Sequence, residues 1–268
     1  MLRNFLIWLF ATEGKPGEIA WLNVWHIVYA VIIFGGTFAL GYYISKRNEE
    51  EKNKLLSLLA TSTVLVYILD FFIQPLMDGG AGVMNVDKLP FHICTMLCPV
   101  LALVQFNKRF AFLKEPVAFL AIVGPMMYIV YPGAAIGDIS PFCYKIIQTF
   151  VYHGLVFSWG FNMIASGTVK PSIKRGWWRA LLSIVGVAIW ATLGNLSHNG
   201  TGEGAHHYDW FFLTGSTFPF VPKMLMPIAV IAAIFAVTMC VYGIYYAVIR
   251  VKAKMNKKDT APTKEIAV

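Results

Sequence analysis

Long apolar stretches recur along the chain and are separated by short polar segments. A helix needs about 20 apolar residues to cross the ~30 Å hydrocarbon core of a bilayer. Stretches of this kind predict seven spans, at roughly 23–45, 55–77, 90–107, 111–132, 142–166, 178–196 and 224–250. The pattern therefore predicts an all-α membrane protein with seven transmembrane helices.

The two ends of the chain differ from this apolar middle. Residues 1–22 begin with a short apolar run that contains Trp8, and we expect them to lie on the outer membrane surface as an interfacial segment. Residues 23–250 are expected to form one seven-helix transmembrane domain. Residues 251–268 are rich in Lys and then polar, which predicts a basic, disordered cytoplasmic tail.

Basic residues in the loops indicate the orientation of the helices. They follow the first, third, fifth and seventh spans: Lys46, Arg47, Lys52, Lys54, Lys108, Arg109, Lys170, Lys174, Arg175, Arg250 and Lys252. The loops between them carry few, such as Lys88 and Lys223 at span edges. The positive-inside rule then places the N-terminus outside and the C-terminus in the cytoplasm. An odd number of spans requires the two ends to lie on opposite sides of the membrane, which agrees with this orientation.

The composition supports the membrane assignment and removes a competing one. Hydrophobic residues make up 57% of the 268 residues and charged residues only 13%, with a mean hydropathy of +0.62. A soluble domain is rarely so apolar. The net charge of +8 follows from the basic loops and tail, so we expect no nucleic-acid partner.

Four of the apolar spans contain an ionisable residue: His26, Asp70, His92 and His153. Such a group in hydrocarbon costs ~2.5–3.5 kcal/mol for Asp on insertion scales, so these residues usually face a bundle interior, a cavity or one another. For His26, near the outer end of the first span, we expect a structural hydrogen bond. For Asp70, an ion pair with Lys145 or a His is the structural alternative to a functional role.

Polar side chains align at helical spacing on the spans that carry these residues. One face of the second span carries Thr63, Tyr67, Asp70 and Gln74. One face of the fifth carries Lys145, Thr149 and His153, with Gln148 and Tyr152 on the adjacent row. The third span adds His92 and Thr95, and Asn195 closes the sixth.

The depth of these residues predicts a pocket that opens outward. At 1.5 Å per residue, His153 lies ~18 Å below the start of its span, and Asp70 lies ~10 Å from the outer edge. The inner half is expected to be much drier, with Glu115 as its main charge. A channel would need polar lining at both depths, so a blind pocket open to the outside fits better.

Two short motifs resemble a known family. Residues 89–94, Leu-Pro-Phe-His-Ile-Cys, open the third span, and residues 148–154, Gln-Thr-Phe-Val-Tyr-His-Gly, lie in the fifth. They resemble the bacterial YwaF-type integral membrane family, which is similar to eukaryotic seven-helix membrane acyltransferases that move arachidonoyl groups onto ether phospholipids. The resemblance covers about residues 85–225. It implies the same seven-helix topology and a multi-pass protein of the bacterial plasma membrane.

The resemblance implies lipid acyl transfer, but it matches only part of the chemistry. The eukaryotic pattern has Pro-Cys-His where this chain has Pro90, Phe91 and His92, so Phe91 replaces the expected nucleophile. His92 and His153 match the pattern. Cys94 lies nearly one helical turn from Phe91 and could present its thiol to the same cavity, where a nearby His would take the proton.

We therefore predict an outward-facing pocket that binds or modifies a membrane lipid or another amphiphile. The candidate catalytic residues are His153, His92, Cys94 and Asp70. The candidate substrate-binding residues are Gln74, Thr95, Lys145, Gln148, Thr149, Tyr152 and Asn195. We expect no cofactor and no bound metal, and the sequence leaves the oligomeric state open.

Two other functions stay open. A small-solute transporter or membrane binding subunit is the first, because Gly124-Pro125 and Pro227 could kink their helices near a polar site. A zinc-dependent lipid hydrolase is the second, because three His and a carboxylate could hold zinc. The chain contains no His-Glu-x-x-His motif.

Overall fold

A computed structural model describes residues 18–77, 89–132, 140–200, 207–213 and 220–259. Within them lie seven α-helices: α2 (Val24–Ser45), α3 (Glu49–Met77), α4 (Ile93–Phe106), α5 (Lys114–Val130), α6 (Tyr144–Ala165), α7 (Ile173–His198) and α8 (Met226–Asp259). Short 3-10 helices add η2 (Lys108–Leu113), η3 (Trp210–Phe212) and η4 (Lys223–Leu225). Each α-helix overlaps one predicted span, which confirms the all-α prediction.

The helices differ in how well they suit a bilayer. Of those described, five are long and apolar enough to cross it: Val24–Ser45, Glu49–Ile73, Lys108–Val130, Lys174–His198 and Lys223–Val251. α4 is apolar but has only 14 residues, and α6 carries the polar side chains predicted for the fifth span. The chain is thus a multi-pass membrane protein, while the number of spans and the orientation stay predictions.

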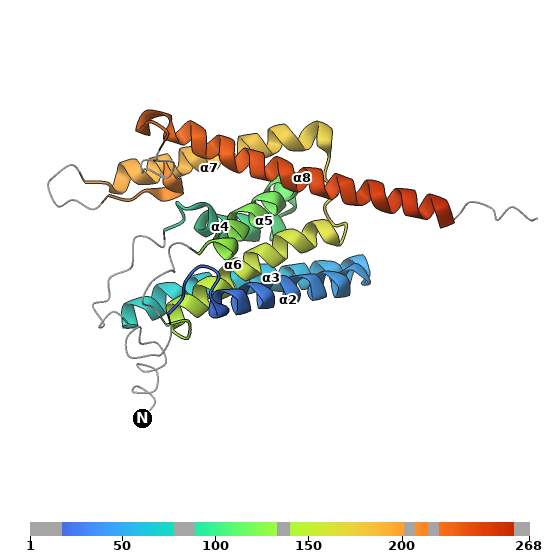
Figure 1. Cartoon of the computed structure of the whole chain (residues 1–268), viewed down its shortest axis with the longest axis horizontal. Coiled ribbons are helices and arrows are strands. Elements are labelled where there is room, and N and C mark those ends of the chain that lie inside the picture. Colours follow the sequence, from blue (N-terminus) through green and yellow to red (C-terminus); the bar gives the residue numbers. More distant parts are fainter. Residues whose placement is uncertain (1–17, 78–88, 133–139, 201–206, 214–219, 260–268) are drawn as a thin grey trace, which may run out of the picture.

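The helices are arranged in three layers (Figure 1). α7 and α8 lie on one side, α4 and α5 in the middle, and α2, α3 and α6 on the other side. Consecutive helices run in opposite directions, so α2, α4, α6 and α8 all begin at one end of the bundle. We call this the outer end, because the charge pattern predicts that it faces outward.

α5 forms the centre of the bundle. Twelve of its seventeen residues are buried, whereas α2 buries only four of its twenty-two. Gly160 of α6 allows close contact with α5, since a Cβ there would lie 2.6 Å from the Ala118 carbonyl oxygen and 2.8 Å from the Ala121 Cβ. Small residues at such crossings are typical of membrane helices, whose backbones approach closely there.

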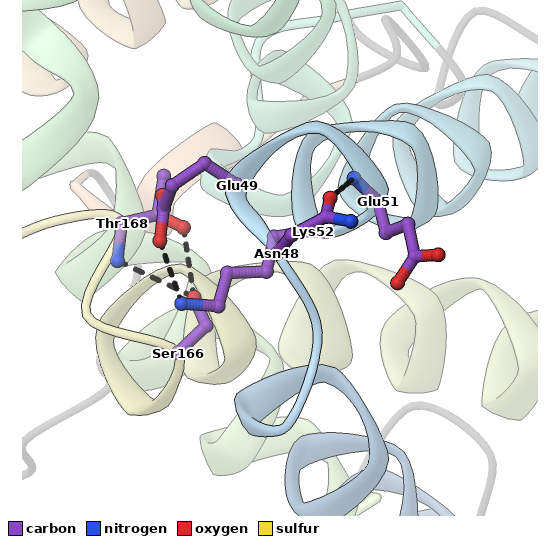
Figure 2. A network of polar contacts seen from close by, with 6 residues as sticks. All are labelled: Asn48, Glu49, Glu51, Lys52, Ser166 and Thr168. Atoms are coloured by element: carbon purple, nitrogen blue, oxygen red, sulfur yellow. Dashed lines mark hydrogen bonds and ion pairs between the residues drawn. The ribbon is translucent and has the colours of Figure 1, made fainter.

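The inner ends of α3 and α6 are fixed by local polar contacts (Figure 2). Asn48 precedes α3 and its side-chain oxygen accepts a hydrogen bond from the Glu51 N–H at 2.9 Å. Lys52 pairs with Glu49 at 2.7 Å, beside the hydrogen-bonded Ser166 and Thr168 hydroxyls at the end of α6. An N-cap followed by acidic residues stabilises a helix start, which is why α3 begins before the predicted residue 55.

The inner half of the bundle is more polar than predicted. Gln105 of α4 donates to Asn53 at 3.1 Å and to Ser57 at 2.9 Å on α3, and it accepts from the Trp159 indole of α6 at 3.1 Å. Spacing along one helix could not reveal this network, because the partners of Gln105 come from two other helices.

Glu115 belongs to a second buried network in the inner half. Its carboxylate accepts from the Ser172 N–H at 2.8 Å and from the Tyr242 hydroxyl at 3.1 Å, and Arg179 lies 3.6 Å away. These contacts join α5 to the start of α7 and to α8. The expectation of a dry inner half is therefore wrong.

Two proline predictions have different outcomes. Pro227 is the second residue of α8, where a missing N–H costs no intrahelical hydrogen bond, so the predicted kink there is wrong. Pro125 does lie inside α5, which continues to Val130.

α8 continues to Asp259, past the predicted start of the tail at residue 251, since Lys, Ala and Met favour helix. Residues 260–268 lie outside the described ranges.

Candidate functional site

His153 is held in one orientation by two neighbours. Its Nδ1 lies 2.7 Å from the Thr149 carbonyl oxygen, and its ring stacks on Tyr128 of α5 at 4.1 Å with an interplanar angle of 10°. A carbonyl oxygen can only accept, so Nδ1 carries the hydrogen and Nε2 is the basic nitrogen of the neutral ring. The side chain is buried, with 8% of its surface exposed.

Tyr152 connects this histidine to the start of α4. Its hydroxyl donates to the Cys94 carbonyl oxygen at 2.6 Å, and its ring lies 5.5 Å from the His153 ring and 5.9 Å from the Tyr67 ring. Cys94 is the second residue of α4 and is half-buried. The structure thus brings candidate residues from the third and fifth predicted spans to one place.

Asp70 has a tyrosine partner from α6. The carboxyl group is buried and forms a side-chain hydrogen bond with Tyr144, the first residue of α6. A helix N-terminus favours a nearby negative charge. Lys145, the expected ion-pair partner, has an exposed side chain.

His92 and Phe91 lie at the outer end, under the segment 207–213, which we call the outer cap. His92 is the N-cap of α4 without a side-chain capping bond, and its ring is 5.3 Å from Phe212. Phe91, at the position expected for a nucleophile, packs against aromatic rings at 4.8–5.4 Å: Trp190, His198 and Trp210. An aromatic cluster therefore occupies the place of the expected cysteine.

The outer cap is fixed to α7 by two asparagines. Asn195 accepts from the Trp210 N–H at 2.9 Å and donates to its carbonyl at 3.1 Å, and Asn199 pairs with Tyr208 in the same way. Asn195 and Asn199 are about one helical turn apart, and Tyr208 and Trp210 are two extended residues apart. These two lengths are similar, so both pairs of hydrogen bonds can form at once. These bonds give Asn195 a structural role.

The outer cap also contains unusual backbone. Phe211 and Phe212 adopt φ values of 66° and 56°, a left-handed conformation that is uncommon for residues other than Gly. Phe211 is buried and Phe212 is half exposed. Such conformations persist only where surrounding contacts enforce them, and here the asparagine pairs supply those contacts.

The chain matches the model of the TMEM164 family over residues 21–246. The chain belongs to the TMEM164 family. Neither the comparison with curated proteins nor that with solved structures gives a match. The family match and the apolar helices together make this a multi-pass membrane protein.

Most of the remaining candidate residues of this TMEM164-family chain form hydrogen bonds with groups close to them in the sequence. Thr95 donates to the Leu89 and His92 carbonyls at 3.1 Å each, and Thr149 donates to the Lys145 carbonyl at 2.7 Å. Gln148 is buried beside Thr149 at 3.3 Å. The side chain of Gln74 lies outside the described residues.

Sequence reasoning about this TMEM164-family chain missed Tyr128 and Tyr144. Each contacts a predicted site residue from another helix. Neither was singled out in the polar stripes, because Tyr128 stands alone in an apolar span and Tyr144 lies at a helix start. His26 was placed correctly as a structural residue: Nδ1 accepts from the Leu22 N–H at 3.0 Å, and Nε2 donates to the Ile129 carbonyl at 2.8 Å.

Metal binding finds no support in the described part of this TMEM164-family chain. Those residues contain no group of three or more His, Cys, Asp or Glu that could hold an ion. His206, one of the outer histidines, lies outside them.

Proposed function

We propose that this TMEM164-family protein transfers acyl groups between membrane lipids in the outer half of its helix bundle. The observation that carries the proposal is the placement of His153, with Nε2 as its basic nitrogen, next to Tyr152, whose hydroxyl donates to the backbone carbonyl oxygen of Cys94. The resemblance to YwaF-type proteins and to eukaryotic acyltransferases supports the same reaction. The lipid partner and the bacterial plasma membrane location belong to this proposal.

Cys94 is the nucleophile in the proposed reaction. His153 Nε2 takes the thiol proton, and Cys94 Sγ attacks the carbonyl carbon of an acyl ester of the donor lipid. The ester bond breaks, and the lyso-lipid leaves as an alcohol after receiving the proton from His153. A hydroxyl group of the acceptor lipid then attacks the thioester, with His153 as base, which restores the Cys94 thiol.

The start of α4 supplies the electrostatic part of this reaction. His92 provides no side-chain cap for the helix, so N–H groups of the first turn can stabilise the negative charge that develops on the substrate carbonyl oxygen. His92 orients the lipid at the outer end of the pocket. Asp70, bonded to Tyr144, fixes the start of α6 four residues before Gln148.

The test is to trap an acyl-enzyme. The purified protein in nanodiscs is incubated with a phospholipid carrying an isotope-labelled acyl chain, and the intact mass is measured before and after hydroxylamine, which cleaves thioesters. We expect a labelled adduct that hydroxylamine removes. The His153→Gln variant should form it ~10²–10⁴-fold more slowly, as is typical when a general base is lost.

Cys98 provides a matched control. It lies one turn from Cys94 on the same face of α4 and is buried. We expect Cys94→Ala to abolish the adduct and Cys98→Ala to retain it. An adduct that persists in Cys94→Ala, or that disappears equally in both variants, would refute Cys94 as the nucleophile.

A further inference from the structure

An apolar groove of about 440 Å³ runs along the side of α2 that faces away from the rest of the helix bundle. α2 lines it with residues that include His26, Ala30, Gly35 and Phe38, and α5 adds Ile129 and Val130 from its last turn. Ligand sites in proteins typically measure about 300–1,000 Å³. His153 and Cys94 are not among the lining residues, so the groove is separate from the proposed acyl-transfer site.

The groove offers no free hydrogen-bonding group from its one polar lining residue. His26 uses Nδ1 to accept from the Leu22 N–H and Nε2 to donate to the Ile129 carbonyl. The other lining residues are apolar or Gly. A polar solute would lose its hydrogen bonds to water without replacement, whereas a hydrocarbon occupant loses nothing.

The length of the groove suits one acyl chain. From His26 to Phe38 the rise along α2 is ~18 Å, slightly more than half of the ~30 Å hydrocarbon core. The acyl chain of a lipid in one leaflet reaches to about the same depth.

Aromatic residues surround the outer end of the groove. The Trp21 indole N–H donates to the Val130 carbonyl at 3.1 Å, and the rings of Trp21 and Tyr131 lie 5.8 Å apart, edge to face. Both side chains are more than half exposed. Trp and Tyr concentrate at the level of lipid headgroups, so this end of the groove lies where a lipid headgroup would be.

We propose that this groove binds one acyl chain of a phospholipid, whose headgroup lies beside Trp21 and Tyr131. The proposal does not depend on acyl transfer, because binding here involves none of the residues of the reaction. Gly35 lines the groove and keeps it open because it has no side chain. Its neighbour Gly36 does not line the groove. A Cβ built at either residue would have nothing within 4 Å.

The test uses a phosphatidylcholine with a photoreactive diazirine in one acyl chain. The full-length protein is reconstituted in nanodiscs containing this lipid, irradiated and mapped by peptide mass spectrometry. Leu65 and Phe72 of α3 are 54% and 67% exposed and report the background from lipids that surround any membrane protein. We expect labelling at Ala30, Phe34 and Val130 to exceed this background.

Two neighbouring substitutions separate the groove from the rest of α2. Gly35→Leu fills part of the groove and should reduce labelling there to the α3 background, because the Leu side chain occupies space that the bound chain needs. Gly36→Leu adds the same side chain outside the groove and should leave labelling unchanged. Thermal unfolding of both variants establishes that they are folded.

Three results would overturn the proposal. The first is labelling of the groove at the α3 background level, and the second is an equal effect of Gly35→Leu and Gly36→Leu. The third is a cross-link from the groove to a second protein chain in place of the lipid. Loss of acyl transfer with unchanged groove labelling would bear on the reaction alone, so the two proposals can fail separately.

Discussion

At the scale of single residues, hydrogen-bond partners fix the ring tautomers of two buried histidines. His26 and His153 are both buried, at 3% and 8% exposure. Both ring nitrogens of His26 bond to backbone groups, which makes it a structural link between the start of α2 and the end of α5. In His153 the bond to the Thr149 carbonyl fixes Nδ1 as the donor and makes Nε2 the basic position of the ring.

Gly194 and Phe91 form a contact that can be tested by compensation. A Cβ at Gly194 would lie 2.4 Å from Phe91 ring atoms. We expect Gly194→Ala to destabilise the protein by ~1–3 kcal/mol, as overpacking typically does, and to lower the apparent melting temperature in detergent. Adding Phe91→Leu should recover part of that loss, because the obstacle is a side chain.

Gly186 is the control for this prediction. It lies on the same helix, and a Cβ at Gly186 would have no neighbour within 4 Å, so Gly186→Ala should be neutral or stabilising by up to ~1 kcal/mol. Equal melting temperatures for Gly186→Ala and Gly194→Ala would contradict the packing of Phe91 against α7.

At the scale of helices, ends and crossings depend on partners that are distant in sequence. Asn48 starts α3 locally, and the sequence around it could have revealed this cap. Asn195 of α7 and Asn199, its C-cap, instead bond to the outer cap fifteen and nine residues later. Hydropathy reveals neither, because it measures only how apolar a segment is.

The crossing of α5 and α6 gives a prediction of a different kind. A Cβ at Gly160 would meet the Ala118 carbonyl oxygen at 2.6 Å and the Ala121 Cβ at 2.8 Å. We expect Gly160→Ala to separate the helices and to cost more stability than Gly194→Ala, since a backbone atom cannot change rotamer. Fluorescence-detected size exclusion and thermal unfolding measure this.

Truncating the neighbour should not rescue this variant. Ala121→Gly removes the Cβ contact but leaves the Ala118 carbonyl in place, so the double variant should stay destabilised. Gly243→Ala on α8, with nothing within 4 Å, is the matched control. Full rescue by Ala121→Gly would show that the backbone contact is unimportant.

At the scale of the whole molecule, α4 and α6 are suited to a membrane only because other helices surround them. α4 has 14 residues and spans ~21 Å, less than the ~30 Å hydrocarbon core. α6 buries twelve of its twenty-two residues, including much of its polar stripe. Neighbouring helices cover both, and a membrane protein tolerates short or polar segments where protein, not lipid, surrounds them.

The orientation of the molecule can be tested by cysteine accessibility. In a background where Cys94, Cys98, Cys143 and Cys240 are replaced by Ser, single cysteines are placed at Arg47, Lys174 and Phe220. We expect a membrane-impermeant maleimide to label Phe220→Cys in intact cells. It should label Arg47→Cys and Lys174→Cys only after permeabilisation, because basic loops remain in the cytoplasm. The reverse pattern would invert the predicted topology.

The sequence by itself determined the class, the positions of the helices and the residues of the polar stripes. These follow from hydropathy and helical spacing, which are properties of each segment alone. Thr149, Tyr152 and His153 were singled out as candidates in this way, and His26 was recognised as structural.

Only the tertiary structure decided how these residues pair. It placed Tyr128 on His153, Tyr144 on Asp70 and an aromatic cluster around Phe91, and it revealed the polar networks around Gln105 and Glu115. In a bilayer each buried polar group needs a partner from within the protein, and these partners come from other helices. Spacing within one helix therefore locates such groups but cannot name what they bind.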